Sequence, residues 1–193
     1  VNVAVTQRIK NAQQEFEKDV AGGSLFLHIV LPGRKDLYLA EGEVVIKESI
    51  PYALNNNDRD DAVRFYYRNG NLQVYAPFEM SKIDMLSLSL EDRQKDMSSI
   101  PKDSLPALQL HNIAPRNLLS FLGQQIMINS VEEKARLNWQ ASDNDDLPDL
   151  LKIVVSTKKE RVEDFVFGKA GVRALEPNFK CGNLFFSVAY GAK

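Results

Sequence analysis

Residues 62–78 read AVRFYYRNGNLQVYAPF, two runs of β-forming residues on either side of Asn69-Gly70. Asn-Gly is the preferred pair for a two-residue type I′ turn, because both central residues of that turn need a positive φ. A turn at this place pairs residues whose numbers sum to 139. The sequence therefore predicts a β-hairpin with a fixed register.

The predicted hairpin has two dissimilar faces, because successive side chains of a strand point to opposite sides. One face is apolar and is expected to lie in the core; it consists of Val63, Phe65, Tyr67, Leu72, Val74 and Ala76. The other, which we call the polar hairpin face, carries Arg64, Tyr66, Arg68, Asn71, Gln73 and Tyr75. Tyrosine and arginine are enriched at interface hot spots. We predict an interface formed by Arg64, Tyr66, Arg68, Gln73 and Tyr75.

The residues before the hairpin predict a helix followed by strands. Apolar residues recur at three- and four-residue steps from Val5 to Val20, which is typical of an amphipathic helix, and Gly22-Gly23 predicts its end. The apolar segment 24–31 predicts a strand. The segment 36–48 predicts another, in which a bulge at Gly42 explains a change in apolar parity.

The residues after the hairpin predict a second helix and further strands. Pro115 fits the first turn of a helix, and its apolar stripe comprises Leu118, Leu119, Leu122 and Ile126. Residues 130–141 fit a strand by alternation, and they also fit a helix, because Ser130 and Glu133 have the spacing of a capping box. The strand is favoured because Leu137 would fall outside the helical stripe. Strand-like runs at 150–156, 161–175 and 183–191 close the chain.

These elements predict a β-rich α+β fold in a single domain over residues 1–193. We expect an antiparallel sandwich or partly closed barrel with an N-terminal helix and one inserted helix. A parallel α/β fold is disfavoured because strands follow strands instead of alternating with helices. The length is ordinary for one domain, and no linker or internal repeat divides the sequence.

Composition excludes several classes of protein. Cys181 is the only cysteine and there are two histidines, so neither a disulfide framework nor a zinc site is expected. The formal net charge of -2 argues against a duplex-DNA binder. No signal peptide or apolar run long enough to span a bilayer is visible, so we expect no membrane partner and favour the cytoplasm or a virion.

No set of residues with convergent catalytic chemistry is visible. His28 lies inside an apolar strand, His111 precedes the second predicted helix, and no nucleophile motif accompanies either. The acidic loops at 55–61 and 142–149 lack the pattern of a calcium site, so solvated turns are favoured while cation binding stays open. No phosphate-binding motif is present. We therefore predict no catalytic residue, no metal site and no cofactor.

These observations favour a non-enzymatic structural protein that works by homo-oligomerisation, with virion and phage tail-tube subunits as the fold-level analogy. Its expected partners are copies of itself or other assembly subunits. One alternative is a module that binds single-stranded nucleic acid on the polar hairpin face, which the acidic net charge disfavours. Another is a small-ligand carrier or hydrolase with a pocket in the β-domain.

Overall fold

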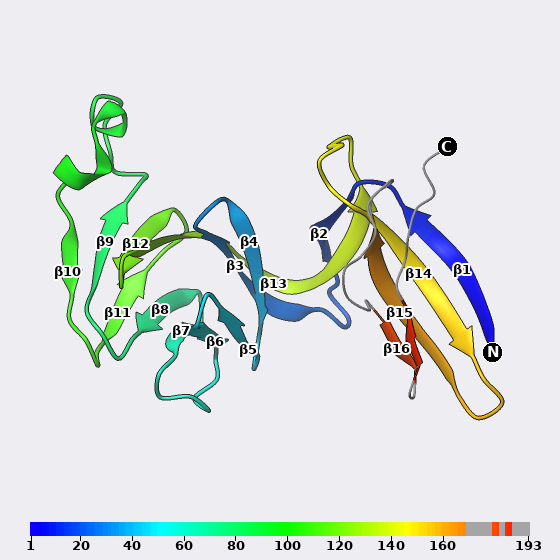
Figure 1. Ribbon diagram of the computed structural model, residues 1–193. Coiled ribbons are helices and arrows are strands. Elements are labelled where there is room, and N and C mark those ends of the chain that lie inside the picture. The colour runs from blue at the N-terminus through cyan, green and yellow to red at the C-terminus, as the bar shows by residue number, and fades with distance from the viewer. Residues whose placement is uncertain (169–178, 182–183, 187–193) are drawn as a thin grey trace. The chain divides into compact units, whose positions relative to one another are not determined.

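The computed structural model describes residues 1–168, 179–181 and 184–186 (Figure 1). These residues form β-strands and two short 3-10 turns, η1 (Asp92–Gln94) and η2 (Met97–Ser99), with no α-helix. The described chain is therefore all-β, and the prediction of an α+β fold is wrong. No helix in this part of the chain has the length and apolarity to cross a membrane. Of the residues predicted to form strands, 169–175, 183 and 187–191 lie outside the described residues.

The predicted N-terminal helix is two strands, β1 (Asn2–Ile9) and β2 (Ala12–Lys18). Asn11, with φ of 48°, turns the chain between them, and β1 pairs with β14 while β2 pairs with β13. The supposed helical stripe is not a buried face, since Val5 and Val20 are 58% and 66% exposed. Pairing with strands distant in sequence has overridden a local three- and four-residue periodicity.

The predicted inserted helix is also a pair of strands, β12 (Asn117–Phe121) and β13 (Gln124–Ala141). Leu122 and Gly123 have φ values of 46° and 75°, as a tight hairpin turn requires. Leu119 and Ile126 lie opposite each other and are fully buried. Because β13 extends to Ala141, the strand prediction for residues 130–141 is confirmed.

The chain divides into two compact units, one of residues 1–17 with 137–193 and one of residues 18–136. The first contains a three-stranded antiparallel sheet of β1, β14 (Asp149–Ser156) and β15 (Arg161–Gly168). A separate pair consists of β16 (Phe179–Cys181) and β17 (Leu184–Phe186). The two boundaries between the units fall within β2 and β13, and a single domain over residues 1–193 stays a prediction.

The unit of residues 18–136 is built from two sheets. The order of the first is β10-β9-β12-β13-β3-β4, with β2 also paired to β13. Its further strands are β3 (Ser24–Leu31), β4 (Lys35–Ala40), β9 (Met80–Asp84) and β10 (Asp103–Leu105). The order of the second is β11-β8-β7-β6-β5. Its strands are β5 (Val44–Lys47), β6 (Ile50–Leu54), β7 (Val63–Arg68), β8 (Asn71–Tyr75) and β11 (Leu110–Ile113).

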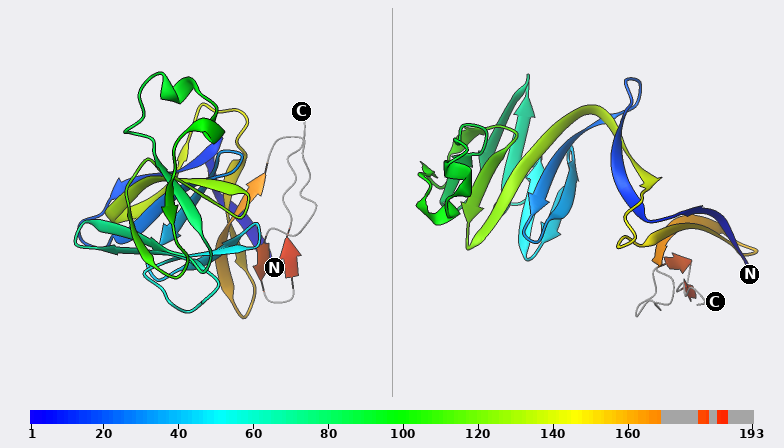
Figure 2. Two further views of the ribbon diagram at one scale, coloured as in Figure 1. Left: turned by 90° about the vertical axis from the view of Figure 1, so that its left-hand side faces the viewer. Right: turned by 90° about the horizontal axis from the view of Figure 1, so that it is seen from above.

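The strands of these two sheets can be followed in Figure 2, and the two sheets share one hydrophobic core. Leu27 and Ile29 of the first sheet and Phe65 and Val74 of the second are fully buried in it. Gly42, with φ of 78°, lies between β4 and β5, which belong to different sheets. It therefore marks the place where the chain passes from one sheet to the other, and the prediction of a bulge within one strand is wrong.

Tyr52 of β6 should make the stability of this unit sensitive to alkaline pH. Burial raises the pKa of Tyr52 to about 12, whereas a tyrosine in an unfolded chain titrates near pH ~10. The folded state thus holds the phenolic proton more tightly. This stabilisation is complete below pH ~10 and is lost as the pH rises from ~10 through ~12. Urea midpoints at about pH 9 and about pH 11 should fall more in the wild type than in Tyr52→Phe; equal falls would contradict the assignment.

Candidate functional site

The hairpin at Asn69-Gly70 forms with the predicted register. The φ values of Asn69 and Gly70 are 52° and 79°, both positive as a type I′ turn requires. β7 and β8 pair antiparallel from Arg64 opposite Tyr75 to Arg68 opposite Asn71. The predicted segregation of side chains is also confirmed. Every member of the apolar face is buried except Tyr67, which is half-buried, and no member of the polar hairpin face is buried.

An unusual connection lies beside the polar hairpin face. β6 and β7 are parallel neighbours, yet only residues 55–62 join them. A parallel pair ordinarily needs a crossover of a dozen or more residues, because the chain must return to the end where it started. Arg64 and Tyr66 hydrogen-bond to residues of this loop, so the loop lies against the polar hairpin face. Ala53, which pairs with Arg64 from β6, is only 1% exposed.

Arg64 anchors this crossover loop. Its Nε and one terminal nitrogen donate to the carbonyl oxygen of Arg59 at 2.9 and 2.7 Å, and the terminal nitrogen also pairs with an Asp60 oxygen at 2.6 Å. The guanidinium lies 5.3 Å from the centre of the Tyr75 ring. Burial lowers the pKa of Arg64, but hydrogen bonds to Asp60 and Tyr66 raise that pKa above its usual range overall. Arg64 and Tyr75 are thus engaged within the protein.

The remaining side chains of the polar hairpin face line a depression of about 360 Å³. Its lining residues are Tyr66, Arg68, Asn69, Asn71, Gln73 and Asn112. Gln73 Nε2 donates to Asn112 Oδ1 at 2.9 Å, and the Tyr66 hydroxyl donates to Asn57 Oδ1. The structure thus brings Tyr66, Arg68 and Gln73 together as predicted, while Arg64 and Tyr75 do not line the depression.

Asn112 is the member of this site that the sequence analysis missed. It lies on β11, a four-residue strand that pairs with β8 so that Asn112 is directly opposite Gln73. The segment LHNI lies in a region predicted to lead into a helix, so no sequence pattern pointed to its pairing with the hairpin. The segment shows no period-2 alternation, because the apolar residues Leu110 and Ile113 enclose two polar ones, so no local signal marks this strand.

The depression carries little positive charge. Arg68 is its only cationic lining residue, and it makes no ion pair in the described part of the chain. The neighbouring Arg64 of β7 forms an ion pair with Asp60 of the crossover loop. Within that loop Arg59 forms an ion pair with Asp61, and its hydrogen bond lowers the pKa of the Asp61 carboxyl. The arrangement suits an uncharged polar ligand better than a polyanion, because nucleic-acid affinity depends on several unpaired cations.

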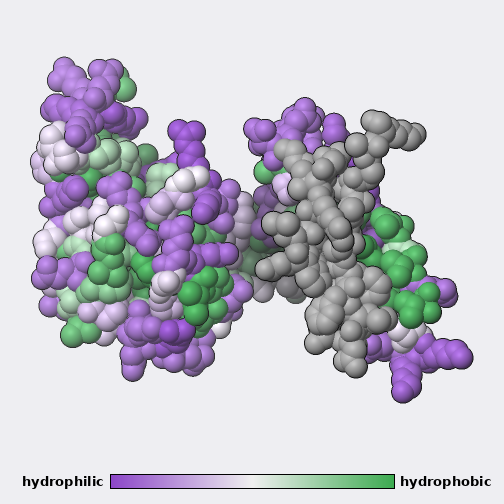
Figure 3. Space-filling model, in the orientation of Figure 1, coloured by the Kyte–Doolittle hydropathy of each residue, from purple (hydrophilic) through white to green (hydrophobic). Residues whose placement is uncertain are grey.

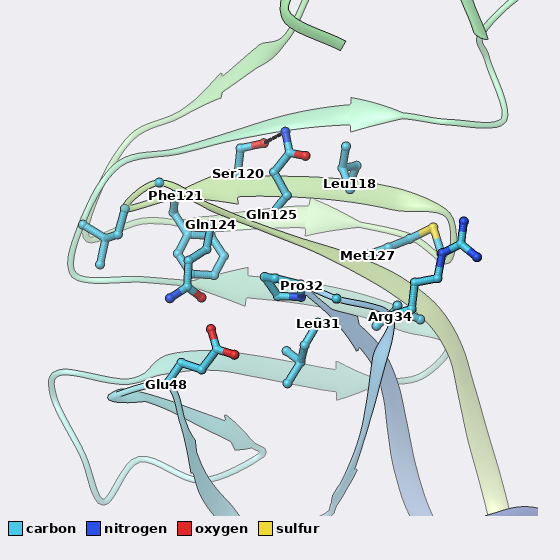
Figure 4. A pocket seen from close by; sticks show the side chains of 14 residues that line it. Leu31, Pro32, Arg34, Glu48, Leu118, Ser120, Phe121, Gln124, Gln125 and Met127 are labelled. Carbon is cyan, nitrogen blue, oxygen red and sulfur yellow. Dashed lines mark hydrogen bonds between the residues drawn. The ribbon is translucent and has the colours of Figure 1, made fainter. Parts of the chain in front are cut away.

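A second concavity, of about 950 Å³, lies on the same unit where the β3–β4, β5–β6 and β12–β13 turns meet (Figure 4). Leu31 and Phe121 contribute apolar surface, while Glu48 and Gln124 face each other across it (Figure 4). Ser120 Oγ accepts a hydrogen bond from Gln125. The groove is open to solvent, so it does not supply the enclosed apolar cavity that a small-ligand carrier requires.

The two histidines both have structural partners. His28 Nε2 lies 2.7 Å from Asp36 Oδ1 and its Nδ1 lies 2.8 Å from Asn129 Nδ2, while its ring stacks on Tyr38. Its neutral form would therefore donate from Nε2 to Asp36 and accept at Nδ1 from Asn129. His111 lies in β11, with its Nε2 2.7 Å from a backbone carbonyl oxygen.

The acidic loops are tied to the protein by hydrogen bonds and ion pairs. In the loop at 142–149, Asp145 accepts a hydrogen bond from the Asn11 side chain, and Asp149 accepts one from the Asn11 backbone amide at 2.9 Å. Two guanidinium nitrogens of Arg8 also lie 2.6 and 2.8 Å from an Asp149 oxygen. Residues 55–61 form part of the crossover loop described above. Among the described residues, no group of three or more His, Cys, Asp or Glu side chains is placed to hold a metal ion.

The edge strand β1 is a further candidate contact surface. It lies at the end of the β1-β14-β15 sheet, and β14 is its only strand partner among the described residues. Val1, Val3 and Val5 are 75%, 52% and 58% exposed. Figure 3 shows hydrophobic residues at the surface in this region. The first five residues, VNVAV, include no charged side chain or proline, the usual means of protecting an edge.

Comparison with protein-family models, with curated proteins and with solved structures gives no match to this chain.

Proposed function

We propose that the protein is a non-enzymatic structural subunit that assembles with copies of itself through the β1 edge. The supporting observation is an exposed strand of eight residues that is paired on one side in the described chain and has exposed valines at positions 1, 3 and 5. Half of the peptide groups of such a strand face outward and can pair with a strand of another chain. Covering the valines at the same time would bury apolar surface, which favours association.

The valine pattern is what distinguishes this edge from an ordinary one. Protected edges carry lysine, proline or a bulge that prevents a second chain from pairing. In β1 the register shift lies between Val5 and Gln7, and the strand before it is uninterrupted. We propose a virion or tail-tube subunit as the class of assembly protein. A second interface on the polar hairpin face also remains a proposal, formed by Arg64, Tyr66, Arg68, Gln73 and Tyr75.

The substitutions Val3→Lys and Val5→Lys should separate the assembly into monomers. Two lysines on the edge would oppose two lysines of a neighbouring copy or leave their charges desolvated, and both outcomes disfavour pairing. Because both valines are exposed, the fold itself should be retained. Size-exclusion chromatography with light scattering, over a range of concentrations, should show an oligomer for the wild type and a monomer for the double variant.

Val20→Lys is the matched control, since Val20 is 66% exposed but lies in a turn outside β1. It should leave the oligomer intact. A wild type that stays monomeric up to its solubility limit would refute the proposal. If the double variant with lysines in β1 remained an oligomer, the interface would have to lie on another surface.

A further inference from the structure

We propose that the depression on the polar hairpin face binds a neutral, hydroxyl-rich ligand, namely a saccharide. The depression belongs to the unit of residues 18–136, whereas the β1 edge belongs to the other unit. The proposal is therefore independent of assembly through the β1 edge and can fail or succeed separately from it.

The chemistry of the lining matches that of a saccharide. Four of the six lining residues have side-chain amides: Asn69, Asn71, Gln73 and Asn112. An amide offers two N–H donors and one carbonyl acceptor from a single planar group. A sugar hydroxyl likewise donates one hydrogen bond and accepts others, so adjacent hydroxyls and amides are mutually complementary. Charged ligands do not need such a set, because cations or carboxylates bind them more strongly.

The lining of the depression is also preorganised. Asn112, Gln73 and Tyr66 lie directly opposite one another on the adjacent strands β11, β8 and β7, so the register of the sheet sets their spacing. The hydrogen bond from Gln73 to Asn112 and that from Tyr66 to Asn57 hold the three side chains in place. Side chains fixed before binding lose less conformational entropy when a ligand arrives, which favours affinity.

The shape and charge of the depression also suit a saccharide. Tyr66 adds an aromatic ring to the amide lining, and a ring can cover the apolar C–H face of a sugar. The volume of the depression, about 360 Å³, falls near the lower end of the range for ligand sites and suits a short segment of a saccharide chain. Arg68 supplies one guanidinium, but Asp60 neutralises Arg64, so the surface does not favour a polyanion.

A panel of neutral oligosaccharides, covering glucose, mannose, galactose and N-acetylglucosamine in α and β linkages, tests the proposal by isothermal titration calorimetry. We expect at least one member to bind, and to shift the side-chain amide signals of Gln73 and Asn112 in NMR spectra. Gln73→Ala and Asn112→Ala should each weaken binding by about tenfold, the effect of losing roughly 1.4 kcal/mol of hydrogen bonding. Gln125→Ala removes an exposed amide on the other sheet and should leave affinity unchanged.

Melting temperatures of all variants establish that the fold is retained. Should one alanine variant unfold, Arg68→Ala is the substitute, because that side chain is exposed and makes no ion pair in the described chain. Absence of binding across the panel would overturn the proposal, as would binding that none of these variants weakens. Salt-sensitive binding of a single-stranded oligonucleotide in place of any sugar would also overturn it and would assign the site to nucleic acid.

Discussion

Replacing Gly23 by alanine is expected to destabilise the protein by about 3 kcal/mol or more, at or beyond the upper end of the usual cost of overpacking. A methyl group at this position would lie 2.4 Å from the carbonyl carbon of Lys134 and 2.5 Å from the carbonyl oxygen of Asp19. Both are backbone atoms, so no side-chain rotation relieves the contact. The Asp19 amide donates to the Lys134 carbonyl at 2.7 Å, and the Gly23 amide donates to the Asp19 carbonyl at 2.9 Å. The turn from Asp19 to Gly23 must therefore separate from Lys134 of β13 to accept the methyl group.

Gly22→Ala is the matched control for this experiment. A methyl group there would lie 3.6 Å from the nearest atom, an Asp19 carboxylate oxygen, which is an ordinary contact. Its effect should be within about 0.5 kcal/mol of zero or slightly stabilising, because alanine restricts the unfolded chain. Urea unfolding followed by circular dichroism measures both variants. Equal stability of the two would show that Gly23 does not approach β13 as described.

Phe65→Ala is expected to cost about 3–5 kcal/mol, the range for removing a large aromatic side chain from a core. Phe65 is fully buried on β7, the central strand of the five-stranded sheet, and belongs to the core shared by the two sheets. Because single domains are stable by only about 5–15 kcal/mol, the variant should lose a substantial part of its free energy of unfolding. Thermal and urea unfolding measure the loss.

Arg68→Ala, on the same strand but exposed, should change stability by no more than about 0.5 kcal/mol. The comparison also tests the hairpin register, because a slip by one residue would exchange the two faces of β7. If Arg68→Ala proved as costly as Phe65→Ala, the assignment of Phe65 to the core and Arg68 to the surface would be wrong.

The hairpin was predictable because its determinants are local. Asn69-Gly70 fixes the turn type, the turn fixes the register, and alternation then assigns each side chain to one face. The pairing of Arg64 with Tyr75 and the burial of Phe65 followed from the sequence alone. The exposure of Arg68 and Tyr66 on one surface followed for the same reason.

The two supposed helices show where local patterns fail. Val5, Ile9 and Ala12 fit a helical stripe, but Val1, Val3 and Val5 also alternate as in a strand, and only β14 decides between these patterns. In the second case, Gly123 interrupted the helical pattern and in fact closes the turn between β12 and β13. Strand partners distant in sequence decided both cases, and one sequence does not reveal them.

The composition of the candidate site was only partly predictable for the same reason. Tyr66, Arg68 and Gln73 share the site because they share the hairpin, whereas Asn112 arrives through the pairing of β11 with β8. Arg64 was expected to be available for contacts. It is engaged by the loop of residues 55–62, and a parallel connection this short is too rare to be expected from sequence.

The short crossover between β6 and β7 also determines where a foreign peptide could be introduced. Residues 55–62 look suitable for an epitope tag by composition, but Asn55 hydrogen-bonds the Tyr67 amide and Arg64 holds the Arg59 carbonyl. Lengthening this loop would detach it from the sheet. The connection from β9 to β10 contains exposed residues such as Leu90 and Lys95, and a tag placed there would leave both sheets intact.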